Sequence, residues 1–352
     1  MNNKSNNNRQ HGNIRNNKKS VKKIKTWKLL IYFLAFQLLF GIATAPIIVY
    51  YSPLFTNLRK NIVGTAMATN SHQFIATLFL SNERISEIIK NAATGGLGAT
   101  VSQDLSKINI GHDKKIEIGT ISGGHKFNGW LVVVHDPSRV KVGYTKNLGK
   151  SGQKTSQIAK ENNAVAAING GGFNDKGNNS TSTWTGNGGL PTGIIISNGK
   201  LIFPYAGEAD TKAANTGVVG IDSKGKMIVG DYSIDDLLSK GVTEALCFGP
   251  TLIENGVSKS GINSQGANPR TAIGQRKDGS ILLLTLDGRT GLEAGASIED
   301  VQQVMQKAGA YNAVNLDGGA STTMYYNGKV KNTPSDTKFG ERPIPTAIYV
   351  KK

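Results

Sequence analysis

The sequence predicts an α+β protein: a mixed, mostly antiparallel sheet domain with a few helices, preceded by an N-terminal transmembrane helix. Three observations lead to this prediction. Glycine is abundant, with 43 residues among 352, and many glycines stand in turn dipeptides between short apolar runs. Several of these runs show the apolar alternation of period two that is typical of strands. Near the N-terminus, residues 29–51 contain no charged side chain.

The N-terminal segment predicts a single crossing of the cell membrane. About 20 apolar residues suffice to span a bilayer, and residues 29–51 exceed that length. Residues 1–28 carry nine basic side chains and no acidic one, so the positive-inside rule places this tail in the cytoplasm and the domain outside the cell. The alternative is a cleaved signal peptide with Ala43-Thr44-Ala45 as its site, although we expect Pro46 to hinder cleavage there.

The net charge has a better explanation than nucleic-acid binding. The formal charge is +17, and the nine basic residues of the tail supply about half of it. Because the tail adjoins the apolar segment, this charge is explained as a membrane-orientation signal, and we predict no nucleic-acid partner. Cys247 is the only cysteine, which excludes an intrachain disulfide; we expect it in the core.

We divide the chain into four segments. Residues 1–28 are the basic cytoplasmic tail, and residues 29–51 are the transmembrane signal anchor. Residues 52–105 form a helical connector, in which Ser81 begins a helix. Residues 106–352 form the functional domain.

Turn dipeptides and helix caps mark the elements of the domain. Four turns predict hairpins, at Asn198-Gly199, Lys224-Gly225, Asp278-Gly279 and Asn327-Gly328. Short helices are expected over residues 155–162, 233–239 and 297–307, the last two opened by serine caps. Residues 246–252 are expected to form one strand that is broken by Gly249-Pro250.

Two glycine loops follow apolar runs and suggest one site. The first is Ala167–Phe173, and the second is Asn315–Thr322, which adds an acid and two hydroxyls. Consecutive glycines let successive N–H groups converge on an anion. Each loop alone is also explained as a plain turn, but the two together with the hydroxyl pair favour a site.

The chemical groups near these loops favour glycoside chemistry with a phosphate in the leaving group. Arg270 opens a predicted strand, where a guanidinium suits a phosphate, and Asp287 ends the next strand. None of the five histidines falls in the loops, and GxSxG, P-loop and HExxH motifs are absent from the sequence. Carboxylates can move protons at an anomeric centre, while arginine and N–H groups hold the anion.

Five motifs in order resemble the phosphodiester glycosidase domain family. They are Ala166–Phe173, Phe248–Leu252, Asn268–Gly274, Leu286–Arg289 and Asn315–Thr322. The resemblance implies hydrolysis of a sugar-1-phosphodiester. Carried onto this chain, it implies the catalytic carboxylates Asp317 and Asp287 and the substrate-binding positions Asn169, Gly170, Gly171, Arg270, Thr271, Arg289, Gly318, Gly319, Ser321 and Thr322. The third glycine of the first loop, Gly172, departs from the family pattern.

We therefore expect an extracellular, membrane-anchored phosphodiester glycosidase that acts on a phosphate-linked cell-envelope glycan or exopolysaccharide, as on a Gram-positive surface. One alternative is a non-catalytic module that binds such polymers during their assembly. Another is metal-dependent hydrolysis with Asp287 and Asp317 as ligands of Ca²⁺ or Mg²⁺. We otherwise expect no cofactor.

Overall fold

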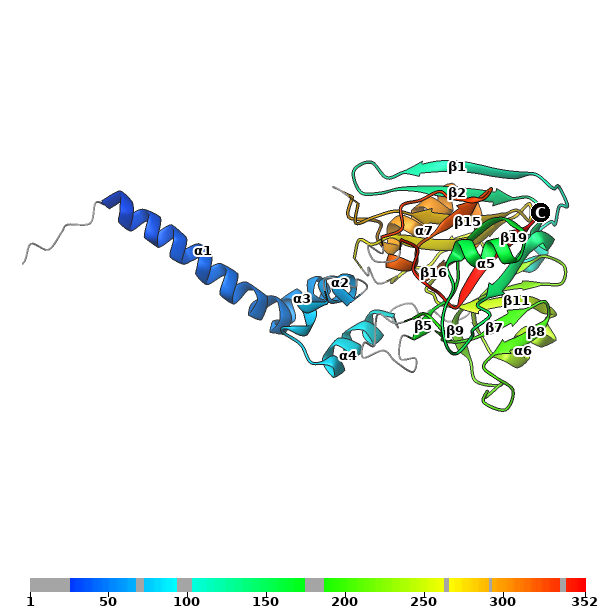
Figure 1. Ribbon diagram of the computed structural model, residues 1–352, viewed down its shortest axis with the longest axis horizontal. Coiled ribbons are helices and arrows are strands. Elements are labelled where there is room, and N and C mark those ends of the chain that lie inside the picture. The colour runs from blue at the N-terminus through cyan, green and yellow to red at the C-terminus, as the bar shows by residue number, and fades with distance from the viewer. Residues whose placement is uncertain are drawn as a thin grey trace, which may run out of the picture. The chain divides into compact units, whose positions relative to one another are not determined.

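The computed structural model describes residues 26–67, 73–93, 103–174, 187–262, 266–290, 293–335 and 340–352 (Figure 1). The first described element is the helix α1, Thr26–Tyr51. Its stretch Trp27–Tyr51 is long and apolar enough to cross a membrane, with a mean hydropathy of 2.0. The helix runs through Pro46. The predicted apolar helix is thus confirmed by its length and composition.

Residues 52–93 contain the helices expected of the connector. They are η1 (Pro53–Phe55), α2 (Thr56–Met67), α3 (Phe74–Thr77) and α4 (Asn82–Ala93). Buried apolar side chains hold them together, among them Val63, Ala76 and Ile85. The backbone N–H of Ile85 donates to the carbonyl of Ser81, which begins α4 as predicted.

Within the described residues, the strands of the domain form three larger sheets and one small ribbon. The seven-stranded sheet has the order β1 (Ile116–Ser122), β2 (Asn128–Val134), β15 (Ile281–Leu286), β14 (Arg270–Arg276), β16 (Ala310–Leu316), β12 (Thr251–Glu254), β13 (Val257–Ser258). One five-stranded sheet has the order β10 (Met227–Tyr232), β9 (Asn215–Asp222), β11 (Val242–Cys247), β7 (Ile195–Ser197), β8 (Lys200–Phe203). The other has the order β18 (Lys329–Val330), β17 (Met324–Tyr326), β4 (Ala164–Asn169), β19 (Thr346–Lys351), β3 (Val140–Tyr144), and the ribbon joins β5 (Phe173–Asn174) to β6 (Leu190–Pro191).

All strand pairings within the described ranges are antiparallel, so the predicted α+β class is confirmed. The four predicted hairpins form, and Asn198 and Asn327 adopt the left-handed backbone that such turns require. The three predicted helices are α5 (Thr155–Glu161), α6 (Ile234–Ser239) and α7 (Ile298–Lys307). Ser233 and Ser297 cap the last two.

A shared core joins the three sheets. It contains Val132 of β2, Ile168 of β4 and Val219 of β9, each at most 3% exposed. Side chains alternate between this core and the outer face of each sheet: Leu283 points inward, whereas Leu284 belongs to the cluster under α7. Helices cover the outer faces, as Figure 1 shows for α7 beside β15 and β16.

One strand prediction is wrong. Residues 246–252 do not form a single broken strand, because β11 ends at Cys247 in a five-stranded sheet and β12 begins at Thr251 in the seven-stranded sheet. Gly249 adopts a left-handed φ of 86°, and Pro250 has no N–H to continue a ladder. This crossing between sheets brings Phe248 to the surface.

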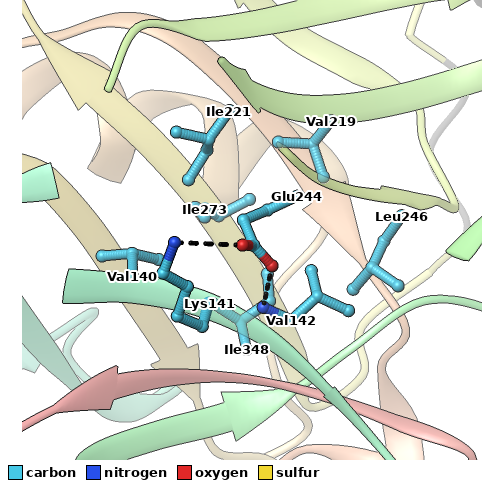
Figure 2. A pocket seen from close by; sticks show the side chains of 9 residues that line it. All are labelled: Val140, Lys141, Val142, Val219, Ile221, Glu244, Leu246, Ile273 and Ile348. Atoms are coloured by element: carbon cyan, nitrogen blue, oxygen red, sulfur yellow. Dashed lines mark hydrogen bonds and ion pairs between the residues drawn. The ribbon is translucent and has the colours of Figure 1, made fainter. Parts of the chain in front are cut away.

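The core between the sheets contains a buried ion pair rather than a ligand site (Figure 2). Glu244 is 2% exposed and accepts from Lys141 Nζ at 3.1 Å and from the Val142 N–H at 2.9 Å. The surrounding cavity is lined mainly by aliphatic side chains and measures about 10 Å³, which is near the lower limit for one water molecule. None of the predicted site residues lines this cavity.

Candidate functional site

The predicted site residues lie together at one end of three neighbouring strands of the seven-stranded sheet, β14, β15 and β16. Because β14 runs antiparallel to β15 and β16, its start lies beside their ends. Arg270 pairs with Leu286, which precedes Asp287, and Thr271 pairs with Leu316, which precedes Asp317. Arg270, Asp287 and Asp317, which are far apart in sequence, thus stand at the same end of the sheet.

The loop after β16 connects two sheets. It leaves the seven-stranded sheet at Leu316, passes through the short helix η5 (Gly319–Ser321), and enters β17 at Met324, beside β4. The end of β4 carries Asn169. The two glycine loops therefore lie together, as their similar sequences predict.

Asn169 ties three of the predicted motifs to one another. Its Oδ1 accepts from Thr271 Oγ1 at 2.7 Å and from the backbone N–H of Thr323 at 3.2 Å. Its Nδ2 donates to the carbonyl of Asp317 at 2.6 Å. Thr271 Oγ1 also lies 3.3 Å from the hydroxyl of Thr322. Asn169, Thr271 and Thr322 are almost completely buried, so this network fixes the loop from beneath.

The predicted anion-binding role of the glycine N–H groups is wrong for the first loop. The N–H of Gly170 donates to the Thr346 carbonyl at 2.8 Å, that of Gly171 to Thr346 Oγ1 at 3.0 Å, and that of Gly172 to the Cys247 carbonyl at 3.1 Å. A Cβ on Gly171 would lie 2.7 Å from the oxygen of Cys247. These glycines permit close backbone packing, and their donors point into the protein.

The second glycine pair serves a similar purpose. The N–H of Gly318 donates to Asp317 Oδ1 at 3.0 Å, and that of Gly319 donates to the Pro269 carbonyl at 2.8 Å. A Cβ on Gly318 would lie 2.8 Å from that same carbonyl oxygen. The pair thus lets the Asp317 loop approach the start of β14, where Arg270 lies.

Arg270 and Arg289 place two positive charges close together. Arg270 is 4% exposed, and its Nε and Nη2 donate to the carbonyls of Ala296 and Gly266. Burial, and then the neighbouring charge of Arg289, lower the pKa of Arg270 to about 10, whereas the carboxylates of Glu299 and Asp317 act in the opposite direction. Two adjacent buried cations repel each other, and an anion between them would relieve that repulsion.

Arg289 has an unusual backbone as well as a buried charge. Its φ is 60°, a left-handed value that an arginine seldom adopts. Burial lowers the pKa of its guanidinium to about 10, and its Nη2 donates to Asn268 Oδ1. A non-glycine residue held in this region costs about 1–3 kcal/mol, and such residues cluster at functional sites.

Asp287 is held by a partner that the sequence does not single out. Asn332 Nδ2 donates to Asp287 Oδ1 at 2.9 Å and to the Thr322 carbonyl at 3.0 Å. The N–H of Thr333 donates to Asp287 Oδ2 at 3.3 Å. Asn332 stands only two residues beyond the last hairpin, so its position near that turn is the one local signal; the contact with Asp287 spans 45 residues.

A third acid, Glu293, also lies near Asp287 and was missed. Its Oε1 accepts from Asn128 Nδ2 at 2.5 Å and its Oε2 from Thr290 Oγ1 at 3.1 Å. Burial raises the pKa of the Asp287 carboxyl, the hydrogen bonds from Asn332 and Thr333 lower it, and the charge of Glu293 raises it. The net effect raises the pKa of Asp287 above that of an ordinary aspartate, so this carboxyl keeps its proton to higher pH.

The hydroxyls of the second loop are buried. Ser321 is 1% exposed and Thr323 is fully buried, and their oxygens have no hydrogen-bond partner among the described residues. An unsatisfied buried hydroxyl costs about 1–3 kcal/mol. Asp317, between Leu316 and these hydroxyls, is only partly buried, so its carboxylate is the more accessible of the two predicted catalytic acids.

Two aromatic residues lie beside the first glycine loop. A Cβ on Gly172 would lie 3.1 Å from the ring of Phe248, which is 37% exposed. The guanidinium of Arg342 stacks over the ring of Phe173 at 4.7 Å. The carbonyl of Gly249 accepts from Asn315 Nδ2 at 2.9 Å, which fastens the Phe248 loop to β16. The site thus combines cations and carboxyls with an exposed aromatic face.

Other chemical groups lie outside this arrangement. Among the residues that the structure describes, no group of three or more His, Cys, Asp or Glu side chains is placed to hold a metal ion. Cys247 is buried, and burial raises the pKa of its thiol to about 12, in agreement with its predicted core position. His135 lies 3.1 Å from both Ser280 and Glu117, but Ser280 precedes β15 and so lies at the opposite end of that strand from Asp287.

The sequence matches a known family over more than half of its length. Residues 162–351 match the family described as phosphodiester glycosidase. The mouse N-acetylglucosamine-1-phosphodiester alpha-N-acetylglucosaminidase is 27% identical over 41% of this chain and 30% of its own length. The SPbeta prophage-derived protein YomE of Bacillus subtilis is 31% identical over 51% of this chain and 27% of its own length. The chain therefore spans under a third of these two relatives.

A solved structure supports the fold. The catalytic domain of the zebrafish N-acetylglucosamine-1-phosphodiester alpha-N-acetylglucosaminidase, auto-inhibited by its pro-peptide, superposes with a TM-score of 0.57. The two share 22% identity over 71% of this chain and 91% of that domain. All five sequence motifs fall within the region of residues 162–351 that matches the family.

Proposed function

This chain belongs to the phosphodiester glycosidase family, and we propose that it hydrolyses a sugar-1-phosphodiester in a phosphate-linked glycan of the cell envelope. The observation that carries the proposal is that the buried guanidinium of Arg270 lies near the charges of Arg289 and Asp317, at the adjoining ends of the strands that lead to Asp287 and Asp317. Cations suit the phosphodiester, and carboxyls suit the anomeric centre.

In the proposed reaction, water attacks the anomeric carbon while the bond from that carbon to the phosphate oxygen breaks. Asp287 gives its proton to this leaving oxygen, because its raised pKa favours the protonated form. The Asp317 carboxylate faces the developing positive charge of the sugar and accepts the proton of the attacking water. The products are a free sugar and a phosphomonoester.

The remaining site residues have separate roles in this proposal. Arg270 and Arg289 hold the phosphate. Ser321, whose hydroxyl is unpaired among the described residues, takes a phosphate or sugar oxygen. Phe248 offers its exposed ring to a sugar face, as aromatic side chains do in ligand pockets. Asn169, Thr271 and Thr322 position the loops from beneath, and the glycines admit their close approach.

The location of the reaction is also part of the proposal. We place the domain outside the cell and the tail inside, anchored by the apolar helix. The basic residues that precede the helix support this orientation, since basic flanks stay in the cytoplasm. A phosphate-linked envelope polymer is the anionic substrate that we propose on that side.

The test is an assay of the full chain in detergent against a panel of sugar-1-phosphodiesters and UDP-N-acetylglucosamine, with products identified by mass. Wild-type protein and the surface control Asp113→Asn should release free sugar and phosphomonoester. Asp287→Asn and Asp317→Asn should not. Binding of phosphorylated polymer without release of sugar from any substrate would instead favour the non-catalytic module.

A further inference from the structure

The short helices after α1 expose large apolar side chains that their own core does not use. Leu54 is 87% exposed and Leu78 is 70% exposed, although leucine is among the residues most often buried. Together with their exposed apolar neighbours they form what we call the juxtamembrane patch, which consists of Leu54, Phe55, Leu58, Phe74, Ile75 and Leu78.

The patch belongs to a folded unit. Beneath it, Val63 and Ile85 are fully buried, with Ala66 and Ile88 beside them. Exposed apolar patches of this kind mark sites of interaction with a membrane or a protein. Arg84 and Glu87 form an exposed ion pair on α4, a helix that contributes no residue to the patch. Arg59, which follows Leu58 on α2, is buried.

The chain connects α1 directly to the patch residues of η1 and α2, which are Leu54, Phe55 and Leu58. Tyr51 is the last residue of the apolar helix, and Leu54 follows it by three residues. Three extended residues reach at most about 11 Å. Arg59 shortens this connection, since its Nη1 donates to the carbonyls of Tyr50 and Ser52 at 2.9 and 3.2 Å. If α1 spans the bilayer, Leu54 must therefore lie within its interfacial layer.

The remaining patch residues, Phe74, Ile75 and Leu78, are held by hydrogen bonds to the C-terminal end of α1. Tyr50 Oη donates to the Ile75 carbonyl, and Tyr51 Oη donates to the Phe79 carbonyl, both at 2.5 Å. The rings of Tyr50 and Phe79 stack with centroids 5.1 Å apart. These contacts fix α3, which carries Phe74 and Leu78, to the point where the apolar helix leaves the bilayer.

We propose that the juxtamembrane patch inserts into the lipid of the leaflet next to the end of α1, so that the short helices lie on the membrane surface. The partner is the acyl-chain boundary of the bilayer, as for interfacial amphipathic helices. The proposal requires α1 to span the membrane and holds for either orientation. It does not depend on the proposed enzymatic activity.

The chain offers a direct test through single labelled cysteines. Cys247, the only native cysteine, is buried with the pKa of its thiol raised to about 12, so it resists labelling. Leu54→Cys and Leu78→Cys would each carry a bimane label in the full chain, reconstituted in phosphatidylcholine vesicles with plain or brominated acyl chains. Ser86→Cys, on the exposed face of α4, is the control.

We expect brominated acyl chains to quench most of the fluorescence at positions 54 and 78 and little of it at Ser86. Equal quenching at all three positions, or quenching at none, would overturn the proposal. If the labels are shielded from water only when the ratio of protein to lipid is raised, the patch is a contact surface between copies of the chain. The lipid proposal is then wrong. If alkaline carbonate extracts the chain from the vesicles, α1 does not span the membrane, and the proposal is wrong.

Discussion

The side chain of Asn332 holds the carboxyl of Asp287, with Nδ2 and Oδ1 separated by 2.9 Å. This bond lowers the pKa of Asp287 against the larger effect of burial. In Asn332→Ala the pKa should rise further. If Asp287 acts as the acid, the alkaline limb of the kcat/KM profile should then move to higher pH, and kcat should fall.

The control for this experiment is Lys329→Ala, an exposed change in the same hairpin. Its pH profile should match that of the wild type. An alkaline limb that stays in place in Asn332→Ala, or moves to lower pH, would show that Asp287 is not the proton donor.

The buried carboxyl of Asp287 should reduce the stability of the folded protein at neutral pH. Because its pKa in the folded state lies above 3.8, the folded state favours the protonated form. The contribution of Asp287 to the free energy of unfolding of the wild type is therefore lost as the pH rises from about 4 through the pKa of this carboxyl in the folded state. Asp287→Asn carries no such charge, so its Tm should gain on that of the wild type as the pH rises.

Thermal melts across this pH range, with Asp113→Asn as the surface control, measure this difference. The activity of Asp287→Asn should fall by about 10²–10⁴-fold, while its stability relative to the wild type should rise toward neutral pH. A constant difference in Tm across the range would contradict the burial of a titrating carboxyl at this position.

Arg289 should contribute to phosphate binding through the geometry of its guanidinium. Arg289→Lys keeps the charge but removes the planar fork, so KM should rise by about ten- to a hundredfold, which corresponds to about 1.5–3 kcal/mol. Arg276→Lys changes an arginine at the opposite end of the neighbouring strand β14 and is the matched control. Equal KM values for the two variants would argue against a phosphate site at Arg289.

Gly318 should tolerate no side chain. In Gly318→Ala the new Cβ would lie 2.8 Å from the Pro269 carbonyl oxygen, which is backbone and cannot move aside easily. The Asp317 loop should shift, and both Tm and activity should fall. Gly119→Ala is the control, because a Cβ on Gly119, in strand β1, meets no atom within 4 Å. Full activity in Gly318→Ala would contradict the described approach of the loop to β14.

The elements that short-range signals specify could be predicted from the sequence. Asn198-Gly199 and Asp278-Gly279 set hairpins whose register depends on adjacent residues, and Ser297 caps its helix within one turn. The assignment of strands to sheets could not, because β11 and β12 are neighbours in sequence yet belong to different sheets. That choice depends on packing over the whole domain.

The same limit applies to the site. Arg270, Asp287 and Asp317 stand at strand ends and were predicted with the family motifs. Asn332 and Glu293 were missed, because their significance comes from contacts with Asp287 and Asn128 that only the folded chain creates. The glycine loops were located correctly, but the backbone donors of the first loop bind Thr346 and Cys247, and those of Gly318 and Gly319 bind Asp317 and Pro269.

The central claim is that the bond broken lies between the anomeric carbon and the phosphate oxygen. The most direct test runs the reaction of the full chain in water labelled with heavy oxygen and locates the label by mass spectrometry. We predict that the label enters the free sugar and that Asp317→Asn abolishes its incorporation. Label in the phosphomonoester would mean that water attacks phosphorus, and the glycosidase account would be wrong.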